Sequence, residues 1–155
     1  MKHYHIFSRL FCRDFRDKEE IFCMAKLSPK KSLLTTRLYL DDNGTYKGGG
    51  HGRRIKFQHD KDIVDGRDWC PMDFNGEIYN PEKHFKIKIS QKEITETSNF
   101  VKNNVYALEA LCDNDDFYID EFEEVMIPGG EPATQEQIEE QKRKTDKIIS
   151  EIGEQ

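Results

Sequence analysis

The sequence contains no long hydrophobic run. No stretch of its 155 residues approaches the roughly 18 consecutive apolar residues that a membrane-spanning helix requires. Residues 1–9 are interrupted by Lys, His and Arg and contain no apolar segment, so no secretory signal peptide is expected there. The sequence therefore predicts a cytoplasmic protein with no membrane partner.

The cysteines show no spacing that is typical of a metal site or a redox-active pair. None of the four belongs to a Cys-x-x-Cys motif, so we expect reduced, mostly buried thiols, with two disulfides as the alternative in a secreted protein. His3 and His5 would face the same side of a strand and could join a cysteine in binding zinc. Their spacing fits no closed zinc site, so no metal and no cofactor are predicted. The cysteines are Cys12, Cys23, Cys70 and Cys112.

No nucleotide-binding fingerprint is present, although glycines are concentrated at one point. Residues 48–52 hold four glycines around His51, and no Gly-Lys-Ser/Thr follows. Such a loop can approach a phosphate closely, and Arg53 and Arg54 can contact it. With His51 as the proton-transfer group and His59 as a second histidine, one functional alternative is a small metal-independent RNA-cleaving or phosphate-handling enzyme. The simpler interpretation is a flexible connection.

What the sequence does contain is charge, and it is unevenly distributed. Residues 1–92 carry 19 Lys and Arg against 13 Asp and Glu, a net charge of +6, whereas residues 93–155 carry 5 against 17, a net charge of −12. The two sum to the −6 of the whole chain. This difference predicts two surfaces with different partners, or two halves that neutralise each other. Ten Phe, six Tyr and one Trp argue against a disordered chain.

Alternating apolar residues predict strands in the first ninety residues, and a strong hairpin turn follows one of them at Asp41–Gly44. Residues 60–83 are rich in Asp, Gly, Pro and Asn and predict a long irregular connection. The predicted strands are Tyr4–Cys12, Glu20–Leu27, Leu34–Leu40, Arg53–Gln58 and Phe85–Ile89.

The last third of the chain predicts helices. A capping box at Ser90–Glu93 opens a helix whose apolar stripe runs from Ile94 to Cys112. Asp116–Ile127 gathers its apolar residues on one side, which favours a short acidic helix over an edge strand. A second capping box at Thr134–Gln137 opens a C-terminal helix. This helix has Ile138, Thr145, Ile148, Ile149 and Ile152 on its apolar side and the i,i+4 pairs Glu139–Arg143 and Glu140–Lys144 on its polar side.

Together these patterns predict an α+β fold. We expect an antiparallel sheet of about five strands from the N-terminal two-thirds, with two to three helices from the C-terminal third packed mainly on one face. Residues 1–130 are expected to form a single domain, and residues 131–155 an amphipathic helix that packs on the domain or projects from it. The narrow apolar stripe of that helix also permits a homodimer.

Two charged surfaces follow from these elements. The strand residues opposite the core predict a basic sheet face that can bind nucleic acid or another acidic macromolecule. Its members are Arg37, Tyr39, Arg54, Lys56, Lys86 and Lys88. The segment Asp113–Glu124 holds seven carboxylates and no cation, and its outward residues can bind a basic protein or imitate a nucleic-acid backbone. The residues proposed for that contact are Asp116, Asp120, Glu121 and Glu124, with Trp69 as a separate hydrophobic anchor.

The absence of a catalytic set together with the charge division favours a non-enzymatic binding or regulatory protein. In this interpretation the sheet face meets nucleic acid or an acidic partner, and the acidic helix meets a basic protein. An inhibitor that mimics nucleic acid and the enzyme centred on His51 are the alternatives.

Overall fold

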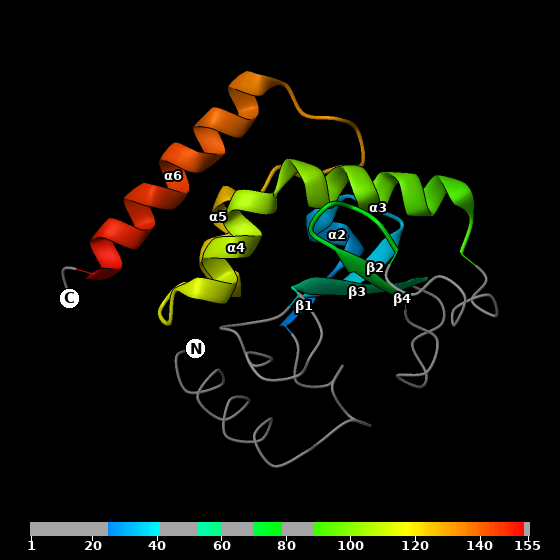
Figure 1. Ribbon diagram of the computed structural model, residues 1–155, viewed down its shortest axis with the longest axis horizontal. Helices are drawn as coiled ribbons and strands as arrows, with labels where there is room; N and C mark the ends of the chain where they lie inside the picture. Colours follow the sequence, from blue (N-terminus) through cyan, green and yellow to red (C-terminus); the bar gives the residue numbers. More distant parts are fainter. Residues whose placement is uncertain (1–24, 41–52, 60–69, 79–88, 154–155) are drawn as a thin grey trace, which may run out of the picture.

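The computed structural model describes residues 25–40, 53–59, 70–78 and 89–153. Within them an antiparallel sheet is covered on one face by helices, which confirms the α+β class (Figure 1). Within the described residues the sheet has four strands, where about five were expected. Five helices form there, and four of them follow residue 90, where two or three were expected. In chain order the elements are β1 (Ala25–Leu27), α2 (Pro29–Ser32), β2 (Thr36–Leu40), β3 (Arg54–His59), β4 (Cys70–Asp73), α3 (Gln91–Asn103), α4 (Val105–Asp113), α5 (Ile119–Val125) and α6 (Gln135–Gly153).

The sheet follows the order of the chain, β1-β2-β3-β4, with every neighbour antiparallel. Its register pairs Leu38 with Phe57 and Leu40 with Ile55, so alternate residues of neighbouring strands share a face. These four side chains are 0 or 1 % exposed and form the sheet side of the core. The predicted alternation of β2 and β3 is therefore confirmed. The predicted strand Tyr4–Cys12 and most of Phe85–Ile89 lie outside the described residues.

Strand β4 corrects the expected irregular connection over residues 60–83. Cys70 and Met72 are buried in the core, and β4 pairs with β3 through Lys56 and Pro71. Proline has no N–H to donate to a ladder, so it is tolerated here because β4 is the last strand of the sheet in the order observed. Among so many turn-forming residues, a four-residue strand containing proline gives little periodic signal.

The helix expected from Ile94 to Cys112 is two helices, α3 and α4, which meet at an angle at Asn104 (Figure 1). Its capping box is confirmed: the Ser90 hydroxyl accepts from the Glu93 N–H at 3.2 Å, and the Glu93 carboxylate accepts from the Ser90 N–H at 3.0 Å. Phe100, on α3, is 0 % exposed and belongs to the hydrophobic core. The apolar stripe thus continues across a break in the backbone.

Helix α3 is attached to the sheet side of the molecule by two hydroxyl groups. The hydroxyls of Thr97 on α3 and Thr36 on β2 lie 2.9 Å apart in the core. The Ser98 hydroxyl donates to the Gly76 carbonyl oxygen at 2.7 Å, in the turn that follows β4. Gly76 has a φ of +79°, and a Cβ there would lie 2.4 Å from the Ser98 Oγ, so this close approach requires glycine.

Side-chain amides of α3 also hold the α5–α6 linker, residues 126–134. The Asn99 amide donates to the Gly130 carbonyl at 2.9 Å. Asn103 donates to the Glu131 carbonyl at 2.7 Å and accepts from the Ala133 N–H at 2.9 Å. The linker lacks helix or strand partners, so these amides replace the backbone hydrogen bonds that it would otherwise lose.

Asn104, at the break between α3 and α4, is the centre of a buried hydrogen-bond network. Its amide nitrogen donates to the carbonyl oxygens of Phe100 at 2.8 Å and Ile127 at 2.9 Å. Its oxygen accepts from the Ile127 N–H at 2.7 Å and from the Gln141 amide of α6 at 2.5 Å. One side chain therefore joins the helix break, the linker and α6.

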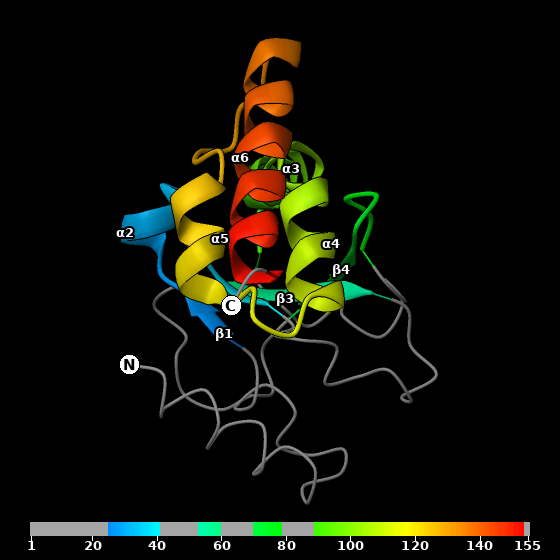
Figure 2. The same ribbon diagram turned by 90° about the vertical axis from the view of Figure 1, so that its left-hand side faces the viewer.

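Helices α5 and α6 confirm two predictions from the sequence. The acidic segment is helical, and the second capping box forms, with the Thr134 hydroxyl accepting from the Gln137 N–H at 3.2 Å. Helix α6 lies between α4 and α5 (Figure 2). Its two fully buried side chains, Gln141 and Thr145, are polar, whereas the isoleucines of its predicted stripe are only half-buried.

The ion pairs of α6 differ in one respect from the expected ones. Arg143 pairs with Glu140, three residues away, at 2.7 Å, and not with Glu139. Glu140 also lies 3.7 Å from Lys144, as the i,i+4 pattern predicts, and Glu139 lies 3.7 Å from Lys142. No helix in the described part of the chain is long and apolar enough to cross a membrane.

Candidate functional site

The acidic segment Asp113–Glu124 divides into carboxylates with partners inside the molecule and carboxylates that face solvent. Asp113 forms an ion pair with Arg53, and Glu123 forms one with Lys31 at 2.5 Å. Glu121 accepts the N–H of Tyr118 at 2.9 Å and so caps the first turn of α5. Glu121 is also one of the residues expected to contact a partner protein, and that contact stays a prediction.

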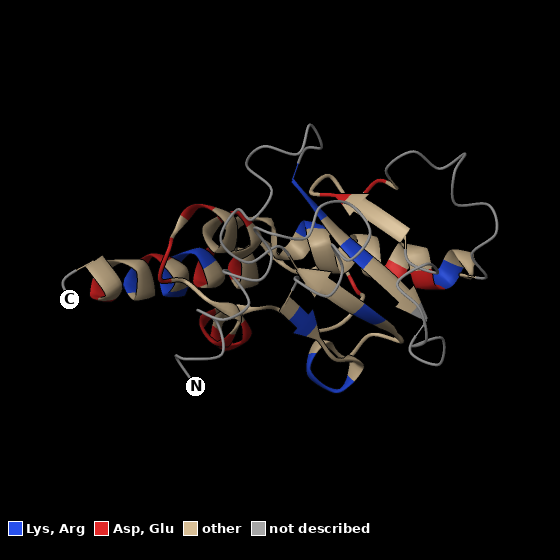
Figure 3. Cartoon of the chain, turned by 90° about the horizontal axis from the view of Figure 1, so that it is seen from below, with Lys and Arg blue, Asp and Glu red and all other residues tan. Residues whose placement is uncertain are grey.

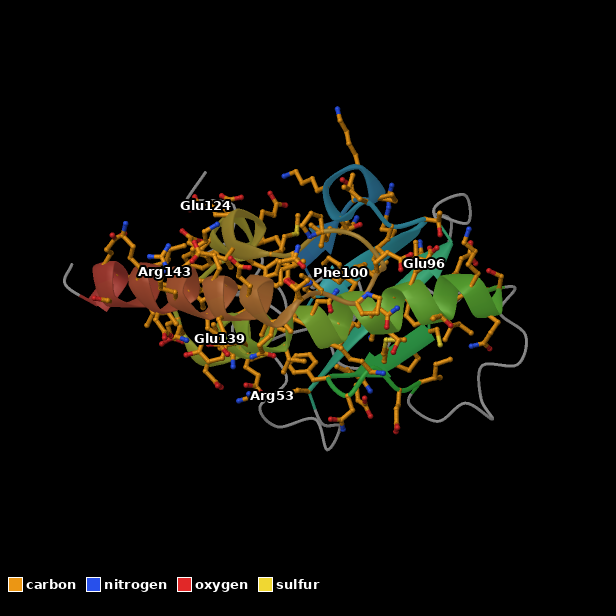
Figure 4. All side chains as sticks on the ribbon, turned by 90° about the horizontal axis from the view of Figure 1, so that it is seen from above. Arg53, Glu96, Phe100, Glu124, Glu139 and Arg143 are labelled. Atoms are coloured by element: carbon orange, nitrogen blue, oxygen red, sulfur yellow. The ribbon has the colours of Figure 1, made fainter. Side chains whose placement is uncertain are left out.

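The other four carboxylates of the segment, Asp115, Asp116, Asp120 and Glu124, are exposed. We call three of them the acidic face of α5: Asp116, which precedes the helix, and Asp120 and Glu124 on it. Asp120 and Glu124 are four residues apart on the helix, which places them about 6 Å apart along its axis. No ion pair joins any of the three to a cation within the described residues. Glu124 lies on the outer side of α5, away from α6 (Figure 4).

The amphipathic pattern of α5 explains why these carboxylates face outward. Ile119, Phe122 and Val125 are spaced three apart and are 8, 0 and 4 % exposed, so one side of the helix is buried in the core. The residues between them are forced toward solvent. The sequence prediction for Asp120 and Glu124 as outward residues of a short helix therefore agrees with the structure, and their binding to a partner stays a prediction.

Two ion pairs connect the basic and the acidic halves of the chain. Lys31 of α2 reaches Glu123 of α5, and Arg53, just before β3, reaches Asp113 at the end of α4. Arg53 lies on the opposite side of the molecule from α5 (Figure 4). Part of the charge difference is thus neutralised within the chain, at two separate places. Neither pair has a signal in the sequence, because its members are 92 and 60 residues apart.

The proposed basic sheet face is on one side of the sheet but is not fully open to solvent. The register pairs Tyr39 with Lys56 and Arg37 with Gln58, opposite the core face (Figure 3). Tyr39 is 5 % exposed and Lys56 is 0 % exposed, so the expectation that they face solvent is wrong. Arg37 and Arg54 are half-buried. Lys86 and Lys88 lie outside the described residues.

The candidate catalytic residues are only partly within the described residues. His51 lies outside them, and Arg53 is paired with Asp113. In the register of the sheet, Arg54 lies opposite Asp73 at one end of β3, and His59 lies opposite Thr36 at the other end. At about 3.3 Å per residue, the five steps between them span roughly 16 Å, so the strand does not bring Arg54 and His59 into one site. Trp69, the proposed hydrophobic anchor, also lies outside the described residues.

The two described cysteines behave as the sequence predicts. Cys70 and Cys112 are free and buried. Burial raises the pKa of the Cys70 thiol from its ordinary 9.0 to about 11, because the thiolate would lose its hydration in the core. Within the described residues no three side chains of the kinds that bind metals lie together. His3, His5, Cys12 and Cys23 lie outside that part of the chain.

Comparison with known proteins returns no relative: no family model matches the chain, and no curated protein and no solved structure is similar to it.

Proposed function

We propose that this protein is a non-enzymatic binding or regulatory protein, and that the acidic face of α5 is its contact with a basic protein. The observation that carries the proposal is the division of the acidic segment described above. Four residues of α5 are carboxylates, and of these Glu121 and Glu123 have partners inside the molecule, whereas Asp120 and Glu124 are exposed. The helix is anchored by its buried apolar side, so it presents these two charges in a fixed arrangement.

A preformed row of like charges favours association with a surface of opposite charge. Complementary charge raises the rate of encounter and suppresses wrong partners more than it raises affinity. Because these carboxylates are exposed, their attraction for a partner is screened by salt over a Debye length of about 8 Å at physiological ionic strength. Binding through the acidic face should therefore weaken clearly as salt is added.

The test is binding of a fluorescent Lys/Arg-rich peptide to the wild type and to the Asp120→Lys/Glu124→Lys variant. The proposal expects the variant to lose most of the binding at low salt, with a decreased association rate. The matched control is Glu136→Lys/Glu151→Lys, which changes the net charge equally at exposed positions of α6. Equal loss of binding in both variants would show a response to net charge only and would contradict a site on α5.

Binding of nucleic acid to the basic sheet face is the second candidate function. It is supported by the register, which brings Arg37 and Arg54 to the same side of the sheet as the exposed Lys26 of β1. The burial of Tyr39 and Lys56 argues for a smaller surface than the sequence suggests. A salt titration with single-stranded RNA and duplex DNA tests it, and binding unchanged by Arg37→Glu/Arg54→Glu would rule it out.

A further inference from the structure

Leu33 occupies a position that is unfavourable for leucine in two independent ways. It is 67 % exposed, in a molecule where Tyr106 is the other large hydrophobic side chain exposed within the described residues. Its φ is +59°, the left-handed conformation that ends α2, and glycine or asparagine is the usual residue there. Neither penalty is offset by a contact of the leucine side chain with the core. Both would be removed by a polar residue that tolerates this conformation.

The surroundings of Leu33 combine apolar and basic groups. Lys30 and Lys31 of α2 are exposed, and among the described residues no carboxylate lies within ion-pair distance of Lys30. The carbonyl of Ser32 accepts the Gly129 N–H at 2.7 Å, which places the exposed Pro128 next to this corner. Leu33 is therefore an exposed apolar side chain next to two exposed lysines, at the end of the short helix α2.

The acidic face of α5 lies next to this corner on the same side of the molecule. The Lys31–Glu123 ion pair joins the basic α2 to the acidic α5 (Figure 3). Glu124 follows Glu123 and is exposed. We call this combined area the α2–α5 surface; it consists of Lys30, Leu33, Pro128, Asp120 and Glu124.

We propose that the α2–α5 surface binds a second copy of this chain in an isologous dimer. A surface with adjacent positive and negative strips complements itself when a copy is turned by half a turn, because each strip then faces the opposite charge. In this arrangement Lys30 of each chain meets Glu124 of its partner, and Leu33 is covered by the contact. A second copy carries both charges in the matching order, which a uniformly basic or acidic partner does not.

This inference goes beyond the proposed function: it uses the same acidic face, but its partner is a second copy of this chain, which has a net charge of −6 and carries both signs of charge at the contact. It adds α2 and Leu33, which that function does not use. A partner with only basic charge would match Asp120 and Glu124 but would offer no opposite charge to Lys30. The self-association therefore accounts for Lys30, Leu33 and Glu124 together.

The test is sedimentation equilibrium of the full chain over a range of concentrations at an ionic strength of about 0.15 M, where repulsion between the −6 net charges is screened. The wild type should dimerise reversibly. Leu33→Asn should raise the dissociation constant by about tenfold or more, because it removes a central apolar contact. Asparagine tolerates the left-handed conformation, so this variant should fold at least as stably as the wild type, and thermal unfolding verifies this.

Charge exchange tests the predicted pairing between copies. Lys30→Glu and Glu124→Lys should each weaken the dimer, and the double variant should restore it, since the swapped charges again meet across the interface. Lys147→Glu/Glu136→Lys on α6 is the matched control and should leave the dissociation constant unchanged. A mass of one chain at every concentration, or a double variant that does not recover, overturns the dimer.

The two proposals fail in distinguishable ways. If the chain is monomeric but the Lys/Arg-rich peptide still requires Asp120 and Glu124, the acidic face has a different, basic partner, and the dimer is wrong. If the chain dimerises and the peptide does not bind, the acidic face serves self-association only. If the chain neither dimerises nor binds the peptide, α5 has neither of the two proposed binding roles.

Discussion

The side-chain amide of Gln141 donates a hydrogen bond to the side-chain oxygen of Asn104, at 2.5 Å and across 37 positions of the chain. Both residues are buried, at 1 and 0 % exposed. This contact joins α6 to the break between α3 and α4, and the same Asn104 oxygen also accepts from the Ile127 N–H. The position of α6 therefore depends on a polar group in the interior rather than on apolar packing only.

Replacing Asn104 with alanine should destabilise the protein more than removal of a typical hydrogen bond. The variant removes the partners of the buried Gln141 amide and of the partly buried Ile127 backbone, so a loss of about 2–4 kcal/mol is expected. Asn114→Ala is the control, because Asn114 makes a single local bond to the Ala110 carbonyl and should cost less than about 1 kcal/mol. Urea unfolding measures both, and similar losses in the two variants would contradict the central role of Asn104.

Gly130→Ala should also destabilise the α5–α6 linker. A Cβ at this position would lie 2.5 Å from the Glu96 Cβ and 2.9 Å from the Glu96 Cα, so the linker has to move. Overpacking of this kind costs about 1–3 kcal/mol. Gly153→Ala is the matched comparison, since nothing lies within 4 Å of a Cβ at that end of α6. Thermal unfolding should show a lower Tm for the first variant and an unchanged or slightly higher Tm for the second.

The Cys70 thiol should be unreactive in the folded protein, because burial raises its pKa to about 11 and the thiolate is the nucleophile. Iodoacetamide labelling followed by peptide mass spectrometry should modify Cys70 only after unfolding. The raised pKa also means that, between pH 9.0 and about 11, the unfolded chain has lost this proton while the native chain keeps it. The stability that depends on Cys70 therefore falls as the pH rises through this range.

Comparison with Cys70→Ala isolates that effect from the titration of other groups. The free energy of unfolding of the wild type minus that of the variant should decrease between pH 9.0 and about pH 11. A difference that stays constant over this range would mean that the Cys70 thiol titrates alike in both states.

Tyr106 should titrate above the ordinary range for tyrosine. Its hydroxyl donates to the Asp146 carboxylate at 2.5 Å, which favours the protonated phenol and raises the pKa of Tyr106. Asp146→Asn should lower this pKa toward the usual value. The ultraviolet absorbance of tyrosinate, taken as the difference from a Tyr106→Phe variant, measures the shift. An Asp146→Asn variant with an unchanged Tyr106 titration would show that the α4–α6 contact is not formed in solution.

Amphipathic periodicity predicted the elements whose apolar residues face one core. Ile119, Phe122 and Val125 identify α5 because a helix buried on one side needs this spacing. The same rule failed at Asn104, since Val101, Val105 and Leu108 keep the spacing of a continuous helix across the break. Periodicity reports which residues are buried, and it does not report whether the backbone between them is continuous.

Alternation in the strands predicted the side of the sheet on which a residue lies, but not its exposure. Tyr39 and Lys56 are on the side opposite the core, as expected, yet both are buried. Whether a sheet face is covered depends on distant parts of the chain, for which a strand pattern carries no information. The pairs Lys31–Glu123 and Arg53–Asp113 were unpredictable for the same reason.

The placement of α6 has a consequence for synthesis of the chain. Its residues leave the ribosome after those of α4 and α5, between which it lies (Figure 2). Until then Asn104 has no Gln141 to bind, and the apolar cluster lacks the cover of Ile148, Ile149 and Ile152. A chain terminated before α6 would therefore expose apolar core residues to solvent, and exposed apolar surface of this kind is what chaperones bind.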